Sequence, residues 1–152
     1  MAATGDVTGR KVLVIDDEPG IIEIVETNLE GDGFVVISAS NGKEGLKKIK
    51  QEAPELVVLD VMMPEMDGWE VLRQIEQDPS IAGLPVIMLT AKAADEDYIY
   101  GLAEGAVEYI TKPFLPQELV NRIKITLMVL NPRMRDERRK NLIAKRQRLM
   151  EQ

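Results

Sequence analysis

Cysteine and histidine are both absent from this chain of 152 residues. Without cysteine it has no disulfide framework, no thiolate nucleophile and no cysteine-rich zinc site. Without histidine it has no serine–histidine triad, no imidazole metal ligand and no phosphohistidine of its own. Chemistry is therefore left to the side chains of Asp, Glu, Lys, Ser, Thr and Tyr.

Long apolar runs are also missing. No stretch approaches the roughly 18 uncharged apolar residues that a membrane-spanning helix needs, and residues 1–10 lack the basic start and apolar run of a signal peptide. We therefore expect a cytoplasmic protein without a membrane partner. Apolar residues make up 45% and charged residues 30% of the chain, as is ordinary for a globular domain.

Charge is unevenly distributed along the chain. Residues 1–130 hold 11 Lys/Arg against 23 Asp/Glu, or −12, whereas residues 131–152 hold 8 against 3, or +5. This difference separates a basic helical tail or linker over 131–152 from one folded domain over 11–130. We expect residues 1–10 to form a flexible leader.

Five short apolar runs rich in Val, Ile and Leu recur in the folded part, as expected for strands buried on both faces of a parallel sheet. They are Lys11–Ile15, Phe34–Ser38, Leu56–Leu59, Pro85–Leu89 and Val107–Ile110. Segments with helical spacing alternate with them over Ile21–Leu29, Gly42–Lys50, Trp69–Glu76, Asp95–Glu104 and Pro116–Leu130. This alternation predicts an α/β fold: an open five-stranded parallel sheet with helices on both faces.

The helical segments carry apolar stripes. The first stripe is Ile21, Ile24, Val25 and Leu29, ahead of Gly31 and Gly33, which can end a helix at positive φ. The last helix of the domain has Leu119, Val120, Ile123, Leu127 and Leu130 on one face. After it, Asn131-Pro132 is expected to begin a helical extension whose narrow stripe is Met134, Leu142, Ile143, Leu149 and Met150.

Polar residues stand just past several predicted strands. They are Asp16-Asp17, Asp60, Thr90 and Thr111-Lys112. The carboxyl ends of parallel strands share one edge of the sheet, where ligands bind in such folds, so these side chains should converge. Three converging carboxylates repel one another unless a cation is present, and oxygen ligands suit Mg²⁺. With Mg²⁺ and the Lys112 ammonium offsetting charge, Asp60 can accept a phosphoryl group whose oxygen the Thr90 hydroxyl can hydrogen-bond.

Four motifs in order along residues 11–130 resemble those of the receiver domain of two-component response regulators. They are Val14-Ile15-Asp16-Asp17-Glu18, Asp60-Val61-Met62-Met63-Pro64-Glu65-Met66-Asp67-Gly68, Leu89-Thr90-Ala91 and Tyr109-Ile110-Thr111-Lys112-Pro113-Phe114. The resemblance implies a flavodoxin-like fold and a signalling switch that catalyses only its own phosphorylation and dephosphorylation. It also implies a phosphoryl donor in trans, either a sensor histidine kinase or a phosphotransfer protein.

The same resemblance implies a role for each site residue. Asp60 would be the phosphoacceptor. Asp17, Asp60 and the Met62 carbonyl would bind Mg²⁺ directly, while Asp16 would act through water. Lys112 would bridge to the phosphoryl group and precede a cis Pro113, and Thr90 with Tyr109 would form the switch pair.

Simpler interpretations of these residues stay open. Asp16-Asp17 alone could cap a helix, Lys112 alone could be a solvated surface lysine, and Thr90 alone could be an ordinary strand residue. A pseudo-receiver would keep the fold and bind partners without phosphorylation. A Mg²⁺-dependent phosphohydrolase is disfavoured because no Gly-rich phosphate loop follows the first strand and no second Asp stands two residues after Asp60.

The tail also has several interpretations. It can be a solvated extension or linker, or a docking or dimerising helix. Nucleic-acid binding is disfavoured because residues 131–152 are too short for a reading module and the body is acidic. The expected output is an interaction with an unknown downstream protein, or a homodimer that forms on phosphorylation.

Overall fold

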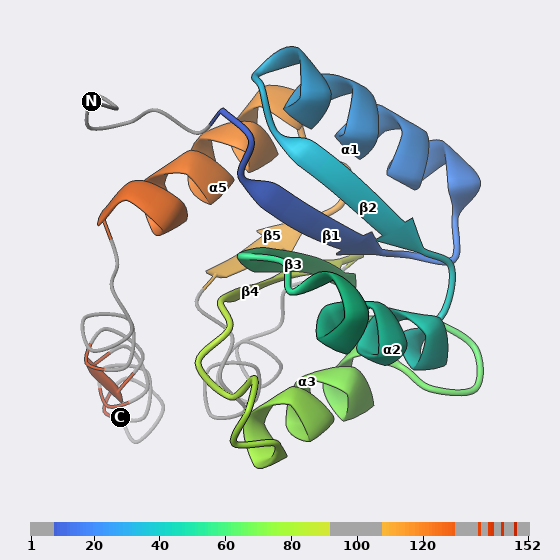
Figure 1. Cartoon of the computed structure of the whole chain (residues 1–152), viewed down its shortest axis with the longest axis vertical. Helices are drawn as coiled ribbons and strands as arrows, with labels where there is room; N and C mark the ends of the chain where they lie inside the picture. Colours follow the sequence, from blue (N-terminus) through green and yellow to red (C-terminus); the bar gives the residue numbers. More distant parts are fainter. Residues whose placement is uncertain are drawn as a thin grey trace.

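The computed structural model describes residues 8–91 and 108–129, together with positions 137, 140, 141, 144 and 148. Its strands, labelled as in Figure 1, are β1 (Lys11–Ile15), β2 (Val35–Ala39), β3 (Leu56–Asp60), β4 (Val86–Thr90) and β5 (Glu108–Thr111). Its helices are α1 (Pro19–Gly31), α2 (Gly42–Glu52), α3 (Gly68–Gln77) and α5 (Pro116–Val129). The isolated positions of the tail are helical. The predicted helix Asp95–Glu104 and the Asn131-Pro132 break lie outside the described residues.

The strands form one parallel sheet in the order β2-β1-β3-β4-β5. This confirms the predicted open five-stranded α/β sheet. Because β3 is the central strand, its carboxyl end lies in the middle of the edge where the predicted site residues converge. In the part of the chain that the structure describes, no helix is long and apolar enough to cross a membrane.

Each face of the sheet has its own apolar core. Helices α1 and α5 cover one face, and α2 and α3 cover the other (Figure 1). Successive side chains of a strand point to opposite faces, so Val12 and Val14 join the core under α1 and α5. Leu13 and Ile15 join the core under α2 and α3. Burial on both faces explains why the strands are apolar throughout.

Side-chain caps determine where α2 and α3 begin. Asn41 Oδ1 accepts a hydrogen bond from the Glu44 backbone N–H at 2.8 Å, and Asp67 Oδ1 accepts one from the Glu70 N–H at 3.0 Å. Each cap satisfies an N–H group that has no partner inside its helix. Asp67 thereby places the start of α3 just after the loop that follows β3.

Two sequence predictions need correction. Asp60, Thr90 and Thr111 are the last residues of their strands, not residues just past them. The ladder continues through these polar positions because their backbones still pair, Asp60 with Leu89 and Thr90 with Thr111. Strands β2 and β4 also begin one residue later than predicted. Val107 lies outside the described residues.

The second correction concerns Ile24, which belongs to the predicted apolar stripe of α1 but is 44% exposed. Val25 and Leu29 are the buried residues of this helix. At about 100° per residue, Ile24 lies more than 100° around the helix from the middle of that buried face. In α5 the predicted face is confirmed for Leu119, Val120 and Ile123, which are fully buried.

Gly68 begins α3 directly against the end of β3. Its N–H donates to Val61 O at 2.9 Å. A Cβ atom at this position would lie 2.3 Å from Asp60 O and 2.9 Å from Val61 Cα. Because both of these atoms are backbone, no side-chain movement can relieve the clash. Glycine is therefore needed for α3 to pack this close to the carboxyl end of β3.

The Gly68→Ala substitution is expected to lower the free energy of unfolding by about 2 kcal/mol or more, because the backbone of β3 or α3 must shift. Urea denaturation measures this change. The matched control is Gly31→Ala, since no atom lies within 4 Å of a Cβ at Gly31 and alanine is the better helix former. Equal destabilisation by the two substitutions would contradict the close approach at Gly68.

Candidate functional site

Asp60 lies at the carboxyl end of the central strand β3 and is only 3% exposed. Its Oδ1 atom is 3.3 Å from the Lys112 ammonium nitrogen. Its Oδ2 atom is buried and has no hydrogen-bond partner among the described residues. A buried carboxylate oxygen without a donor is energetically unfavourable. This atom is therefore a natural point of attachment for a cation or another electrophilic group.

The loop after β1 adds three carboxylates to this edge of the sheet. Asp16, Asp17, Glu18 and Asp60 each offer one oxygen, and these four oxygens lie within 4.8 Å of one another. Asp16 is fully buried, whereas Asp17 and Glu18 are exposed. Asp16, Asp17 and Asp60 thus come together as the sequence pattern predicted, and Glu18 joins them.

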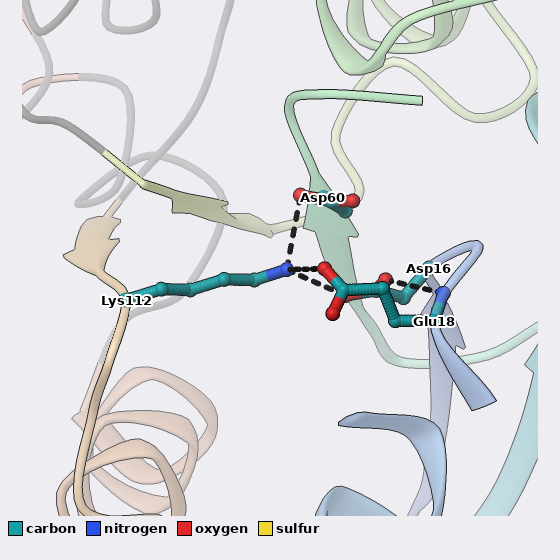
Figure 2. A network of polar contacts seen from close by, with 4 residues as sticks. All are labelled: Asp16, Glu18, Asp60 and Lys112. Carbon is teal, nitrogen blue, oxygen red and sulfur yellow. Dashed lines mark hydrogen bonds and ion pairs between the residues drawn. The ribbon is translucent and has the colours of Figure 1, made fainter. Parts of the chain in front are cut away.

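Lys112 reaches into this cluster from the end of β5 (Figure 2). Its Nζ donates hydrogen bonds to Asp16 Oδ2 at 3.1 Å and to Glu18 Oε1 at 3.3 Å, in addition to its ion pair with Asp60. The backbone N–H of Lys112 donates to Thr90 O, which ties the end of β5 to β4. The Lys112-Pro113 peptide bond is cis, as predicted. Lys112 is thus a half-buried structural part of the site and not a solvated surface lysine.

Burial and charge shift the pKa values of the central pair. Burial first, and then the negative charge of Asp16, raise the pKa of Asp60 from 3.8 to about 6, although Lys112 counteracts both. For Lys112, burial works to lower the pKa. The hydrogen bond and charge of Asp16 and the charge of Asp60 outweigh that effect, so the pKa of the ammonium is raised. Lys112 stays cationic at neutral pH.

The predicted switch pair occupies neighbouring strands. Thr90 ends β4 and is buried, and Tyr109 on β5 pairs in register with Met88, two residues before Thr90. The Tyr109 ring stacks on the Trp69 ring of α3, with 6.3 Å between centroids and 18° between planes. The Tyr109 ring thus packs toward the α2 and α3 side of the sheet. Its pairing with Thr90 as a switch stays a prediction.

Met62 lies two residues after Asp60 in the loop between β3 and α3, and it is 71% exposed. Its position at the same edge of the sheet is compatible with the predicted metal-binding role of its carbonyl. That role stays a prediction.

Glu18 is the site residue that was not assigned a role from the sequence. In the sequence it is only the third residue of the Asp16-Asp17-Glu18 run. The signal available was a third consecutive carboxylate after a buried strand. Its contact with Lys112, which lies 94 residues away in sequence, is visible only in the folded chain.

Comparisons with known proteins agree with this geometry. A family model described as the response regulator receiver domain matches residues 12–124. The alkaline phosphatase synthesis transcriptional regulatory protein PhoP of Bacillus subtilis is 48% identical over 118 residues, which cover 78% of this chain and 48% of that protein. The chain spans about half the length of the curated relatives it matches.

Solved structures agree as well. The chemotaxis protein CheY4 of Vibrio cholerae superposes with a TM-score of 0.73 at 31% identity, covering 77% of this chain and 98% of that one. The response regulator DrrB of Thermotoga maritima, described as an OmpR/PhoB homolog, gives a TM-score of 0.70 at 36% identity, covering 79% of this chain and 53% of that one. The predicted family and flavodoxin-like fold are confirmed, and the chain belongs to the response regulator receiver domains.

Proposed function

We propose that this receiver domain accepts a phosphoryl group on Asp60 and uses the modification to switch its interaction with a downstream protein. The observation that carries the proposal is the buried Asp60 carboxylate, with Oδ2 unpartnered among the described residues and Lys112 Nζ 3.3 Å from Oδ1. A carboxylate in such a position can act as a nucleophile when positive charge balances the incoming phosphoryl oxygens. A domain that only bound partners, as a pseudo-receiver does, would not need this arrangement.

The carboxylate cluster fits a Mg²⁺ ion. Four carboxylates face one ammonium group, which leaves a local charge of −3 when all are ionised. Mg²⁺ prefers oxygen ligands and keeps several waters, so a few protein ligands are enough. When bound, it would neutralise charge on the transferring phosphoryl oxygens.

The hydrogen bonds support different roles for the proposed Mg²⁺ ligands, some direct and one through water. Both oxygens of Asp16 are engaged, Oδ1 by the Glu18 N–H at 2.9 Å and Oδ2 by Lys112. Asp17 is exposed and makes no hydrogen bond or ion pair with the other described residues. We therefore assign direct binding to Asp17, Asp60 and the Met62 carbonyl, and binding through water to Asp16.

The proposed transfer forms one bond and breaks one. An Asp60 oxygen attacks the donor phosphorus, an O–P bond forms, and the P–N bond to the donor histidine breaks, with its electrons returning to the imidazole. Lys112 and the Thr90 hydroxyl would each hold one phosphoryl oxygen. This chain has no histidine, which fits a phosphoryl donor in trans. The donor would be a sensor histidine kinase or a phosphotransfer protein.

Phosphorylation would change both the charge and the hydrogen bonding at the edge of the sheet. Thr90 would move toward the phosphoryl group, and Tyr109 on the neighbouring strand would respond. In this proposal residues 11–130 form the switch and the basic residues 131–152 lead from α5 toward the output. The output would be an unknown downstream protein or a second copy of the domain, and the only reaction catalysed would be the domain's own phosphorylation and dephosphorylation.

The metal-free protein is expected to lose stability as pH rises from about 4 to about 6, because of Asp60. Its pKa of about 6 in the fold exceeds its ordinary value of 3.8, so the folded state binds this proton more tightly than the unfolded state does. The destabilisation is therefore absent below about pH 4 and complete above about pH 6. Urea denaturation with a chelator present, at a series of pH values, measures the effect.

The Asp60→Asn substitution removes that charge and is expected to raise the free energy of unfolding at pH 7 by about 1–3 kcal/mol. Glu23→Gln serves as a control, since Glu23 is an exposed acid on α1. Added Mg²⁺ should stabilise the wild type more than Asp60→Asn, because the metal binds the folded site. If Asp60→Asn were no more stable than the wild type at pH 7, the assigned repulsion would be wrong.

Incubation with Mg²⁺ and acetyl phosphate is expected to add about 80 Da, the mass of one phosphoryl group, to the wild-type chain. Intact-protein mass spectrometry measures the adduct. The adduct should require Mg²⁺ and should be absent from Asp60→Ala. If a candidate kinase, acetyl phosphate and beryllofluoride all left the wild type unchanged, the pseudo-receiver interpretation would replace the proposal.

A further inference from the structure

Three carboxylates of unequal exposure surround Lys112. Its Nζ lies 3.1 Å from Asp16, 3.3 Å from Glu18 and 3.3 Å from Asp60, and the exposed fractions of these side chains are 0%, 61% and 4%. Separating Lys112 from Asp16 or Asp60 leaves a buried charge unpaired, which is strongly unfavourable. Separating it from Glu18 leaves a carboxylate that water already solvates, which costs about 1 kcal/mol or less.

An ammonium group has three N–H donors and no more. In the unphosphorylated domain Asp16 and Glu18 accept hydrogen bonds from the Lys112 ammonium, and Asp60 forms an ion pair with it, so three carboxylates surround it (Figure 2). A phosphoryl oxygen that binds Lys112 must therefore take the place of one existing partner. The difference in burial identifies Glu18 as the partner that leaves.

The backbone around Glu18 also favours an exchange. Glu18 is the N-cap residue of α1, yet its side chain makes no capping hydrogen bond. Its backbone carbonyl accepts from the Ile21 and Ile22 N–H groups, and its own N–H donates to Asp16. The main chain of Glu18 is thus held in place by hydrogen bonds, whereas its carboxylate is held by its contact with Lys112. Once released, the carboxylate remains beside the N-terminus of α1, where the helix dipole favours a negative charge.

We propose that Glu18 competes with the phosphoryl group for Lys112: it binds the ammonium in the unphosphorylated domain and is displaced when a phosphoryl group reaches Asp60. This inference rests on the proposed function of Asp60. Glu18 is then a positioning residue that acts through Lys112. It keeps the ammonium in place between phosphorylation events, and the same contact slows the transfer because it must first be broken.

The test compares phosphorylation rates of the full chain with acetyl phosphate at saturating Mg²⁺, for the wild type, Glu18→Ala and Glu18→Asp. The Asp variant keeps the charge but shortens the side chain by one methylene, which removes the contact. Both variants are expected to react about two- to five-fold faster than the wild type, as the loss of an exposed ion pair implies. Glu23→Gln removes an equal charge elsewhere on α1 and should react at the wild-type rate.

Two further measurements separate this role from a structural or metal-binding one. The urea midpoint of Glu18→Ala should stay close to that of the wild type. Its Mg²⁺ dissociation constant should rise by less than about tenfold, since the variant loses a nearby charge and not a metal ligand. In a crystal structure of the wild type with Mg²⁺ and beryllofluoride, a phosphoryl mimic, Lys112 should retain Asp16 while Glu18 Oε1 lies more than about 4 Å from Nζ, beyond salt-bridge distance.

Several outcomes would overturn the inference while leaving the proposed function intact. They are an unchanged rate in Glu18→Ala, a faster rate in Glu18→Ala but not in Glu18→Asp, and a beryllofluoride complex in which Glu18 keeps its contact. A roughly tenfold weaker Mg²⁺ affinity in Glu18→Ala, with an unchanged rate at saturating metal, would instead make Glu18 a metal ligand. If the wild type were not phosphorylated at Asp60 at all, the proposed function would fail, and the competition with it.

Discussion

The ammonium group of Lys112, held among carboxylates, is the interaction on which the site depends. Asp16 and Asp60 are both buried at the carboxyl ends of neighbouring strands. In that low-dielectric position two like charges would repel each other strongly unless a cation lay between them. Lys112 supplies that cation, because its backbone N–H bonds to Thr90 O and brings the end of β5 against β4. The position of one charge thus follows from the pairing of two strands.

The two apolar cores keep this arrangement rigid. The central strand β3 is buried along its whole length, so the backbone that carries Asp60 has little freedom to move. Gly68 lets α3 begin against the same strand end, within a distance that no other residue permits. The buried residues of the site therefore stand on fixed elements. The exposed ones, Asp17 and Glu18, stand on the loop between β1 and α1.

This contrast between buried and exposed acids gives the cluster its chemical asymmetry. The buried carboxylates are expensive to leave unpaired and so must keep their partners. The exposed carboxylates can exchange water, metal or ammonium at little cost. In the proposed function, a phosphoryl group would therefore bind while Asp16 and Asp60 keep their partners. In the proposed switch, Thr90 and Tyr109 would pass the change to the neighbouring strands.

The amino-acid sequence predicts the order of strands and helices and the buried apolar runs. It also predicts that Asp16, Asp60, Thr90 and Lys112 converge on one edge of the sheet. Each depends on local periodicity or on the rule that parallel strands end at the same edge. The ends of the strands were harder to predict. Asp60 and Thr90 have polar side chains, yet their backbones still pair with the neighbouring strand and extend the sheet. The exposure of Ile24 likewise depended on which face of α1 meets the sheet.

The sequence by itself determined which polar residues stand at the ends of the strands, and only the tertiary structure decided which of them contact one another. Nothing local indicates that Glu18 contacts Lys112, or that one Asp60 oxygen is left without a donor among the described residues. These contacts join residues that are dozens of positions apart, and their distances are set by how the strands and helices pack. A sequence pattern specifies neighbours along the chain, whereas burial and competition for a single ammonium group arise only when distant segments exclude water together.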